Sequence, residues 1–275
     1  MTDTNHQGLI LDQFTRQATV FSTAPSITDE GALLMIVEAV SPGPEDTVLD
    51  VACGPGLVVC AFAPRVREAT GIDVTPAMLE RARALAAEKG LSNVAWRQGD
   101  VYSLPFDDGS FTIVTTRFSF HHFLDPAAVL REMVRVCAPG GRVVVVDDYA
   151  SEDPAKAAAF NQLERLRDPS HVRCLTLTEL KNLFPTVGLP APQVSFYELR
   201  STIGSLLARS FPNPGDDLKI VEMFKASRWT IGSAFRSVSM PRRSTAPTRS
   251  PYSPRSARPN EYSGAFREVS GRGSA

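Results

Sequence analysis

Three carboxylates in the first hundred residues lie within or at the end of short apolar runs, and the first of them precedes a glycine turn. Asp50 lies in the stretch VLDVACGPG, Asp73 ends the stretch EATGID, and Asp100 ends the stretch RQGD. A carboxylate has four lone-pair sites and can accept hydrogen bonds from the hydroxyl or amino groups of a ligand. Gly54 and Gly56 carry no Cβ, so the backbone could turn tightly against such a ligand. Together these residues indicate a site for a small polar molecule.

The glycine turn differs from that of dinucleotide-binding proteins. Their fingerprint is G-x-G-x-x-G, whereas Val59 stands at the third glycine position here. Asp50 lies four residues before Gly54, where its charge would repel a pyrophosphate in a partly dry cleft. The turn therefore favours a cationic or zwitterionic ligand over NAD. Asp50 has a second interpretation that can coexist with the first, because it could accept backbone N–H groups and stiffen the turn.

A second group of polar residues follows a later apolar run. Arg117, Phe118, His121 and His122 come after the run FTIVTT, and residues 147–148 are two Asp that end the run RVVVVDD. Adjacent residues point in different directions, so we expect at most one of the two histidines to face a substrate. A neutral imidazole there could accept a proton from a phenol or an enol. A histidine that only orders its loop by hydrogen bonds is an equally good interpretation, and both histidines are catalytic candidates.

Strands and helices that alternate along the chain must position these residues. Apolar runs predict strands over residues 47–51, 68–73, 94–98, 111–116, 142–147 and 193–199. Periodic segments with cap and stop residues predict helices over residues 29–40, 57–63, 76–89, 126–137, 154–167 and 178–184, the first of them capped by Ser26 or Thr28. This alternation predicts an α/β fold with a doubly wound, Rossmann-like, mostly parallel sheet and helices on both faces. Ligands of such sheets bind beyond the carboxyl ends of the strands, where the glycine turn lies.

The composition of the 275 residues is that of a globular protein, with 43 % hydrophobic content. No run of 18 apolar residues occurs, and the first ten residues contain neither a basic nor an apolar stretch. We therefore expect a cytoplasmic protein without stable membrane insertion. The four cysteines show no CxxC spacing, so we interpret them as reduced, buried thiols and predict no metal site.

The last 48 residues differ in composition from the rest of the chain. Residues 228–275 contain nine Arg, two Glu and no Lys or Asp, a net charge of +7, while residues 1–227 carry −8. Ten Ser and five Pro accompany the arginines, and such a composition buries too little apolar surface to offset chain entropy. We predict an N-terminal helical lid over 1–45, a ligand-binding domain over 46–227 and a disordered tail over 228–275. The arginines are scattered rather than gathered on one face, which does not favour nucleic-acid binding.

Four longer stretches carry a family resemblance: VLDVACGPG, GIDVTPAMLERAR, QGDVYSLPFDDGSF and HHFLDPAAVLREMVRVCAPGGRVVVVD. Together they resemble the class I S-adenosylmethionine-dependent methyltransferases, within which the match is closest to the group of the ubiquinone/menaquinone-biosynthesis methyltransferases. S-adenosylmethionine carries positive charge on its amino group and sulfonium and has no phosphate, which agrees with the charge argument above. The resemblance implies that Asp73 grips both ribose hydroxyls and that Asp100 accepts a hydrogen bond from the adenine amino group. Alternatively, Asp73 only caps the following helix, and Asp100 serves a turn alone.

The resemblance also implies a set of cofactor-binding residues around these carboxylates. They are Asp50, Ala52, Cys53, Gly54, Gly56, Asp73, Val74, Met78, Gly99, Asp100, Val101, Arg117 and Phe118.

Residues outside these stretches are candidates for binding the methyl acceptor. Phe14 and Phe21, in the stretch QFTRQATVF, would form part of a lid over the cofactor or, alternatively, a hydrophobic staple. Arg167 and His171 lie in the segment LERLRDPSHVRCLTLTE, where members of the family insert substrate-recognition elements. Arginines there could hold an acidic or phenolic acceptor. The alternative is an Asp-Pro-Ser turn with solvated arginines.

The sequence departs from the family pattern in two places. Thr112 replaces an Asp that is usual in the fourth strand, which puts the local structure in doubt. The family ends with an antiparallel hairpin whose last strand inserts between the fifth and sixth strand positions. After Ser227 we find no apolar run rich in β-forming residues. We therefore expect this C-terminal strand to be missing, and interpret the tail as not encoding the usual end of the fold.

The expected function is transfer of a methyl group from S-adenosylmethionine to a small-molecule acceptor, a quinol, phenol or related metabolite, by in-line displacement. Two alternatives stay open at this point: an NAD(P)-dependent Rossmann oxidoreductase, and a non-catalytic cofactor-binding scaffold with an altered C-terminus. The missing third glycine, the position of Asp50 and the lack of a Tyr-x-x-x-Lys pair argue against the first alternative.

Overall fold

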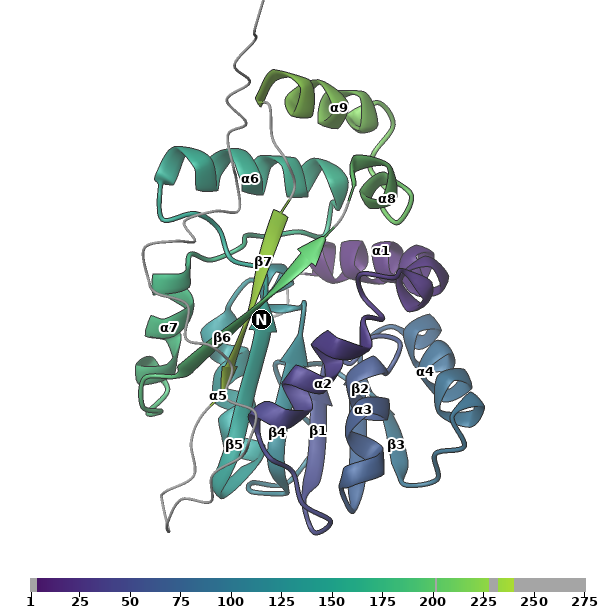
Figure 1. Ribbon diagram of the computed structural model, residues 1–275, viewed down its shortest axis with the longest axis vertical. Coiled ribbons are helices and arrows are strands. Elements are labelled where there is room, and N and C mark those ends of the chain that lie inside the picture. The colour runs from purple at the N-terminus through teal and green to yellow at the C-terminus, as the bar shows by residue number, and fades with distance from the viewer. Residues whose placement is uncertain (1–3, 201, 228–231, 240–275) are drawn as a thin grey trace, which may run out of the picture.

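The computed structural model describes residues 4–200, 202–227 and 232–239, and their centre is one sheet (Figure 1). Within these residues seven strands pair in the order β3-β2-β1-β4-β5-β7-β6. The five strands from β3 to β5 run parallel, whereas β7 is antiparallel to both of its neighbours. The strand bounds are β1 Thr47–Val51, β2 Glu68–Asp73, β3 Val94–Gln98, β4 Phe111–Arg117, β5 Cys137–Asp147, β6 Gln193–Arg200 and β7 Gly232–Ser239. The doubly wound, mostly parallel α/β fold predicted from the alternation is confirmed.

The central strands are almost entirely buried because helices cover both faces of the sheet. All five residues of β1 are buried, as expected of a parallel strand packed on two sides. On one face lie α2 (Glu30–Ala39), α3 (Leu57–Phe62) and α4 (Pro76–Glu88), with Ile36, Phe62 and Leu79 in the core. On the other face lie α5 (Pro126–Val136) and α7 (Leu177–Thr186), with Met133 and Phe184 in the core. The strand ends are therefore held rigidly from both sides.

Helix caps agree with the sequence pattern in most places. Asp125 accepts a hydrogen bond from Ala128 N at 2.9 Å and opens α5, and Thr75 precedes the proline that begins α4. The prediction for α2 was wrong in its cap, because Asp29 accepts from Ala32 N at 2.7 Å in place of Ser26 or Thr28. When several cap-forming residues precede a helix, any of them can be the N-cap. Here the N-cap is Asp29, the one nearest the periodic segment.

Four further helices gather at the end of the sheet toward which the parallel strands point (Figure 1). They are α1 (Thr4–Thr23), α6 (Pro154–Arg167), α8 (Ile203–Leu207) and α9 (Asp216–Ser227). Short 3-10 turns, η1 (Ala63–Arg65) and η2 (Phe120–His122), follow α3 and β4. Helix α1 packs against α4, and α9 packs against α6. In the part of the chain that the structure describes, no helix is both long and apolar enough to cross a bilayer.

Strand β7 corrects the expectation that the C-terminal strand is missing. It pairs with β5 from Val144↔Ser239 to Asp147↔Arg236, and with β6 along its full length. No apolar run marks β7 in the sequence, because the segment GSAFRSVS mixes Ser and Arg with apolar residues. A strand between two partners is held by backbone N–H and C=O groups, which every residue other than proline supplies. Residues 232–239 of the predicted tail thus belong to the sheet, and residues 228–231 and 240–275 lie outside the described residues.

Thr112 is part of a buried polar network at the opposite end of the sheet from the glycine turn. Its Oγ1 donates to Asp46 Oδ1 at 2.7 Å and accepts from Thr47 N at 2.9 Å. Asp46 Oδ1 also pairs with Arg142 Nη2 at 2.7 Å, and Arg142 donates to the carbonyl of Val40. The hydroxyl thus provides one of the hydrogen bonds that a buried ion pair needs, and the local structure is intact at this departure.

Candidate active site

A deep cavity opens at the carboxyl ends of β1, β2 and β4, beneath α1. Its empty space is about 1070 Å³, open solvent included. Most of the site residues predicted from the sequence line it. They are Phe14, Phe21, Asp50, Ala52, Cys53, Gly54, Asp73, Val74, Met78, Asp100, Val101, Arg117, Phe118 and His122. Gly56, Gly99, His121, Arg167 and His171 do not line it.

The two glycines that do not line the cavity serve close packing. Gly56 begins α3 with a φ of 79°, and a Cβ on it would lie 2.5 Å from Trp96 and 2.8 Å from the Cβ of Ala82. A Cβ on Gly99 would lie 2.8 Å from Ile72 Cδ1. These glycines let the strand ends and helices approach each other, and they act on the cavity only through its shape.

Asp73 ties the glycine turn to the next strand end. Its Oδ2 accepts from Gly54 N at 2.8 Å and its Oδ1 accepts from Thr75 N at 2.8 Å. The helix-capping interpretation is therefore part of its role, yet the carboxylate also lines the cavity. Burial raises the pKa of Asp73, although these backbone donors oppose the rise. Each oxygen keeps a second lone pair, so the group can still accept two hydrogen bonds from a ligand.

Asp50 is a buried carboxyl group at the bottom of the same cavity. Only 1 % of the residue is exposed, and its Oδ1 accepts from Thr115 Oγ1 at 2.8 Å. Burial raises the pKa of Asp50 to about 7, while the bond from Thr115 and the charge of Arg117 oppose the rise. Arg117 itself donates to the carbonyl of Ile27 at 2.9 Å and lies over the ring of Phe118. A cationic ligand group would favour the ionised form of this carboxyl.

Asp100 occupies the third strand end. Its Oδ1 accepts from Tyr102 N at 2.9 Å, which is the turn contact that the sequence left as an alternative. The residue nevertheless lines the cavity, and a carboxylate with one backbone partner has lone pairs left for a ligand donor.

Two non-glycine residues at neighbouring strand ends adopt left-handed backbone conformations. Ala52, which follows β1, has a φ of 55°, and Phe118, which follows β4, has a φ of 57°. Both line the cavity. Such conformations are costly for residues with a Cβ and concentrate where function constrains the backbone. No sequence pattern predicts these two conformations, because neither alanine nor phenylalanine favours positive φ.

The two adjacent histidines have different surroundings. His121 Nδ1 lies 2.6 Å from Asp147 Oδ1, and its backbone N–H donates to Asp147 Oδ2 at 2.9 Å. Burial lowers the pKa of His121, but the charge and hydrogen bond of Asp147 outweigh it and raise the pKa to about 9. His121 is therefore a structural cation at neutral pH, paired away from the cavity.

His122 lines the cavity and is the neutral member of the pair. Its Nδ1 lies 3.0 Å from Ser170 O and 3.2 Å from Ser170 Oγ. Burial and then the neighbouring charge of His121 lower the pKa of His122 to about 3. An uncharged imidazole at a cavity wall can accept a proton, so the structure separates the two candidates by their surroundings.

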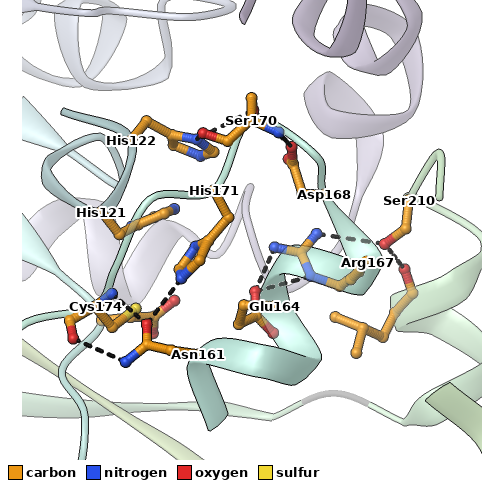
Figure 2. Close-up of polar contacts among 12 residues, drawn as sticks. His121, His122, Asn161, Glu164, Arg167, Asp168, Ser170, His171, Cys174 and Ser210 are labelled. Carbon is orange, nitrogen blue, oxygen red and sulfur yellow. Dashed lines mark hydrogen bonds and ion pairs between the residues drawn. The ribbon is translucent and has the colours of Figure 1, made fainter. Parts of the chain in front are cut away.

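Arg167 and His171 lie in a buried polar cluster rather than at the cavity wall (Figure 2). Arg167 Nη2 pairs with Glu164 Oε2 at 2.6 Å, and its Nη1 donates to Ser210 Oγ at 3.3 Å. His171 Nε2 lies 2.9 Å from Asn161 Oδ1. The prediction that these residues face a substrate is therefore corrected. Arg167 ends α6, and His171 contacts Asn161 of the same helix, so both side chains have their polar partners inside the protein.

One group in this cluster combines metal-ligand types. His121, Asp148 and Cys174 each place a ligand atom within 4.8 Å of the others. The cysteine spacing gave no sign of this group, because the three residues come from separate segments of the chain. The expectation that the chain holds no metal stays a prediction, which elemental analysis of the purified protein would test.

Several further residues, which the sequence did not single out, line the cavity. They are His6, Gln7, Ile10, Tyr102, Ser119, Phe123 and Leu124. For α1 a signal existed, because residues 6, 10, 14 and 21 repeat at the spacing of one helix face. For Tyr102 and Phe123 no periodic pattern exists, since both lie in loops that follow strands.

Comparisons with known proteins agree with this geometry. A family model described as a methyltransferase domain matches residues 49–145. The uncharacterized methyltransferase YcgJ of Bacillus subtilis (strain 168) is 37 % identical over 196 residues, which cover 71 % of this chain and 78 % of the relative. The crystal structure of YcgJ from Bacillus subtilis has a TM-score of 0.68 at 32 % identity, over 76 % of this chain and 96 % of that chain.

Two further relatives add to the comparison. The crystal structure of a putative methyltransferase from Bacillus halodurans C-125 has a TM-score of 0.67 at 28 % identity, over 76 % of this chain and 96 % of that chain. A demethylmenaquinone methyltransferase of Thermus thermophilus is 41 % identical over 102 residues, which cover 36 % of this chain and 46 % of the relative.

Proposed function

Because this chain belongs to the class I S-adenosylmethionine-dependent methyltransferases, we propose that it methylates a small quinol or phenol held beneath α1. The observation that carries the proposal is that two kinds of side chain line a single cavity. Asp50, Asp73 and Asp100 supply carboxyl groups, and aromatic rings such as Phe14 lie around His122. The carboxyl groups suit a charged, hydroxyl-rich cofactor, and the aromatic rings with His122 suit a flat aromatic acceptor with one acidic hydroxyl.

Each of the three carboxylates would bind a different group of the cofactor. Asp73 has lone pairs left for the two ribose hydroxyls, after its two bonds to backbone N–H groups. Asp100 would accept from the adenine amino group. Asp50, a buried carboxyl whose ionised form a positive charge would favour, would face the amino group. Gly54 has a φ of 51°, which keeps the backbone of the turn out of the space between these carboxylates.

In the mechanism, the bound cofactor would supply a methyl group on a positively charged sulfur. The part of this chain is to orient the acceptor, to exclude water and to receive one proton. Phe14 and Phe21 of α1, which line the cavity, would keep water out. When the acceptor takes the methyl group from the sulfur, its hydroxyl proton would pass to Nε2 of His122.

The aromatic part of the lining supports the acceptor class. Phe14, Tyr102 and Phe123 line the cavity, and aromatic side chains pack well against another aromatic ring. His122 is the polar group beside them. One relative bears the name demethylmenaquinone methyltransferase, and its substrate would be a ring of this type. A quinol or phenol therefore satisfies both the apolar lining and the proton acceptor.

An acceptor screen tests this proposal. Purified protein is incubated with S-adenosylmethionine labelled in the methyl group and with quinols, phenols, carboxylic acids and amines of similar size. We expect label in the quinols and phenols, and on the order of 100-fold less label with the Asp73→Ala variant. Transfer to amines alone would overturn the acceptor class while leaving the cofactor assignment in place.

Binding of S-adenosylmethionine is expected to tighten as pH rises through about 7. In the free protein the pKa of Asp50 is about 7 because the group is buried, so part of it is protonated at neutral pH. A cationic ligand favours the ionised carboxylate, and binding then releases a proton. The Kd should fall roughly 10-fold between pH 6 and pH 8. Calorimetry in buffers of different ionisation enthalpy measures both the Kd and the proton release.

Asp50→Asn is the control for this pH dependence. The amide oxygen can still accept from Thr115 but cannot titrate, so the Kd of the variant should be nearly flat across the same range. An unchanged pH dependence in this variant would assign the proton to a different group.

A further inference from the structure

We infer that helix α1 completes the positioning of His122, so that Gln17, Asp168 and Ser170 are positioning residues for the proton acceptor. The inference rests on the proposed function, in which His122 Nε2 receives the proton of the acceptor. It adds that covering the cavity and aligning the imidazole are one structural event.

A chain of hydrogen bonds runs from α1 to the imidazole. Gln17 Nε2 donates to Asp168 Oδ2 at 2.8 Å, and Ser170 Oγ donates to Asp168 Oδ1 at 2.6 Å. His122 Nδ1 lies within 3.0 Å of Ser170 O and 3.2 Å of Ser170 Oγ. Figure 2 shows Asp168, Ser170 and His122 joined in this order. All four residues are at least nine-tenths buried, so water does not compete strongly for these bonds.

The chain fixes which nitrogen of His122 carries the proton. A carbonyl oxygen can only accept, so Nδ1 must be the N–H that donates to Ser170 O. The hydroxyl of Ser170 gives its proton to Asp168, and its oxygen is therefore also an acceptor toward Nδ1. Gln17 and Ser170 thus donate to the carboxylate, and Nδ1 of His122 donates to Ser170. This leaves the lone pair on Nε2, which is the nitrogen needed to receive a proton from the acceptor.

The carboxylate would also stabilise the imidazolium that forms during turnover. The negative charge of Asp168 opposes the lowering of the pKa of His122, and Ser170 connects the two groups. A carboxylate behind a catalytic imidazole holds its tautomer and stabilises its charged form. Asp168 has both functions available here, and it is 1 % exposed.

Helix α1 contacts this unit at three places along one face. His6 Nε2 donates to the carbonyl of His122 at 2.8 Å, and the Phe14 ring meets the His122 ring edge-on at 4.9 Å between centroids. Gln17 supplies one of the bonds to Asp168. If α1 lifted away, a buried carboxylate would lose a partner and the imidazole would lose its packing, both of which are costly. His122 is therefore aligned only while α1 covers the cavity.

Rate measurements with phenols of graded acidity separate positioning from a merely structural role. The probes are ring-substituted phenols whose hydroxyl pKa falls from about 10 to below the assay pH. With weakly acidic phenols, Gln17→Met, Asp168→Asn and Ser170→Ala should lower kcat on the order of 10- to 100-fold. With phenols that are already ionised, the same variants should stay within about 3-fold of the original protein, because no proton has to move. Equal losses on both kinds of phenol would overturn the inference.

Two control variants accompany these measurements. Thr15→Ala lies on the exposed side of α1 and should leave kcat and KM unchanged. Ser170→Thr keeps the hydroxyl and should recover most of the rate that Ser170→Ala loses. Failure of this recovery would indicate that the space around Ser170, rather than its hydrogen bond, sets the rate.

A second measurement needs no methyl acceptor and so separates this inference from the proposed function. Nitrogen-15 NMR of the full chain should show His122 with the proton on Nδ1 and exchanging slowly with solvent. In Gln17→Met this proton should exchange at least 10-fold faster. A proton on Nε2 in the original protein would overturn the inference, even if phenols are methylated. If no phenol is methylated, the proposed function fails and the tautomer still decides the inference.

Discussion

Replacing Asp73 with alanine is expected to weaken the binding of S-adenosylmethionine by roughly 100-fold or more. Its carboxylate lines the cavity with two lone pairs that the backbone does not use. Hydrogen bonds to a charged acceptor contribute about 1.5–3 kcal/mol each, and the ribose diol would form two of them. The change also frees Gly54 N and Thr75 N, so the glycine turn loses its tie to β2. Calorimetric titration measures the loss, with NAD titrated alongside.

Asp153→Ala is a matched control for this variant. Asp153 also accepts from two backbone N–H groups at a helix start, those of Ala155 and Lys156, but it does not line the cavity. Its loss should lower the melting temperature slightly and leave cofactor binding unchanged. Unchanged binding in a folded Asp73→Ala variant would place the cofactor elsewhere, and NAD binding lost in the same variant would favour a dinucleotide site.

The parallel part of the sheet could be predicted because each of its strands can be recognised from its own residues. Strands buried on both faces are mostly apolar runs, and the runs 47–51 and 68–73 agree with β1 and β2 residue for residue. The run 94–98 likewise agrees with β3, the edge strand beside β2. Their carboxyl ends then meet at one edge of the sheet. This is why Asp50, Asp73 and Asp100 could be grouped from the sequence, and all three line the cavity.

The features that escaped prediction depend on partners distant in the sequence. Strand β7 is held by backbone bonds to β5 and β6, so its side chains needed no apolar run. The sequence predicts that Arg167 faces a substrate, because nothing in the local pattern indicates that its partner Glu164 is buried. The link from Gln17 to Asp168 spans 151 positions. Spacing rules describe one helix or strand at a time and cannot reveal such pairs.

Substitution of His122 by asparagine is expected to lower kcat by about 10²- to 10⁴-fold for a phenol of ordinary acidity, the range typical of general-base catalysis. Asparagine can still donate to Ser170 through its amide, but it cannot accept a proton. The carboxylates that would hold the cofactor are untouched, so the affinity for S-adenosylmethionine should stay within about 2-fold. Single-turnover rates with labelled cofactor, together with calorimetry, measure the two quantities separately.

His121→Asn is a useful comparison, because this variant should lose stability whereas His122→Asn should lose kcat. His121 and Asp147 form a pair whose side chains are 8 % and 2 % exposed, and removing one partner of a buried pair costs about 3–5 kcal/mol of unfolding free energy. The charge of His121 lowers the pKa of His122, so its removal does not weaken His122 as a base. Folded His121→Asn should therefore lose no kcat, while it melts earlier.

The pH dependence of stability tests the contribution of the His121–Asp147 pair. Its pKa is raised to about 9 in the folded protein from about 6.5 in an unfolded chain. The stability that the pair contributes is therefore fully present below about pH 6.5 and is lost as pH rises through about 9. Denaturant unfolding at pH 6 and pH 10 should show a large difference between the original protein and His121→Asn at the lower pH and a small one at the higher. A large loss of kcat in His121→Asn, with His122→Asn active, would reverse the roles of the two residues.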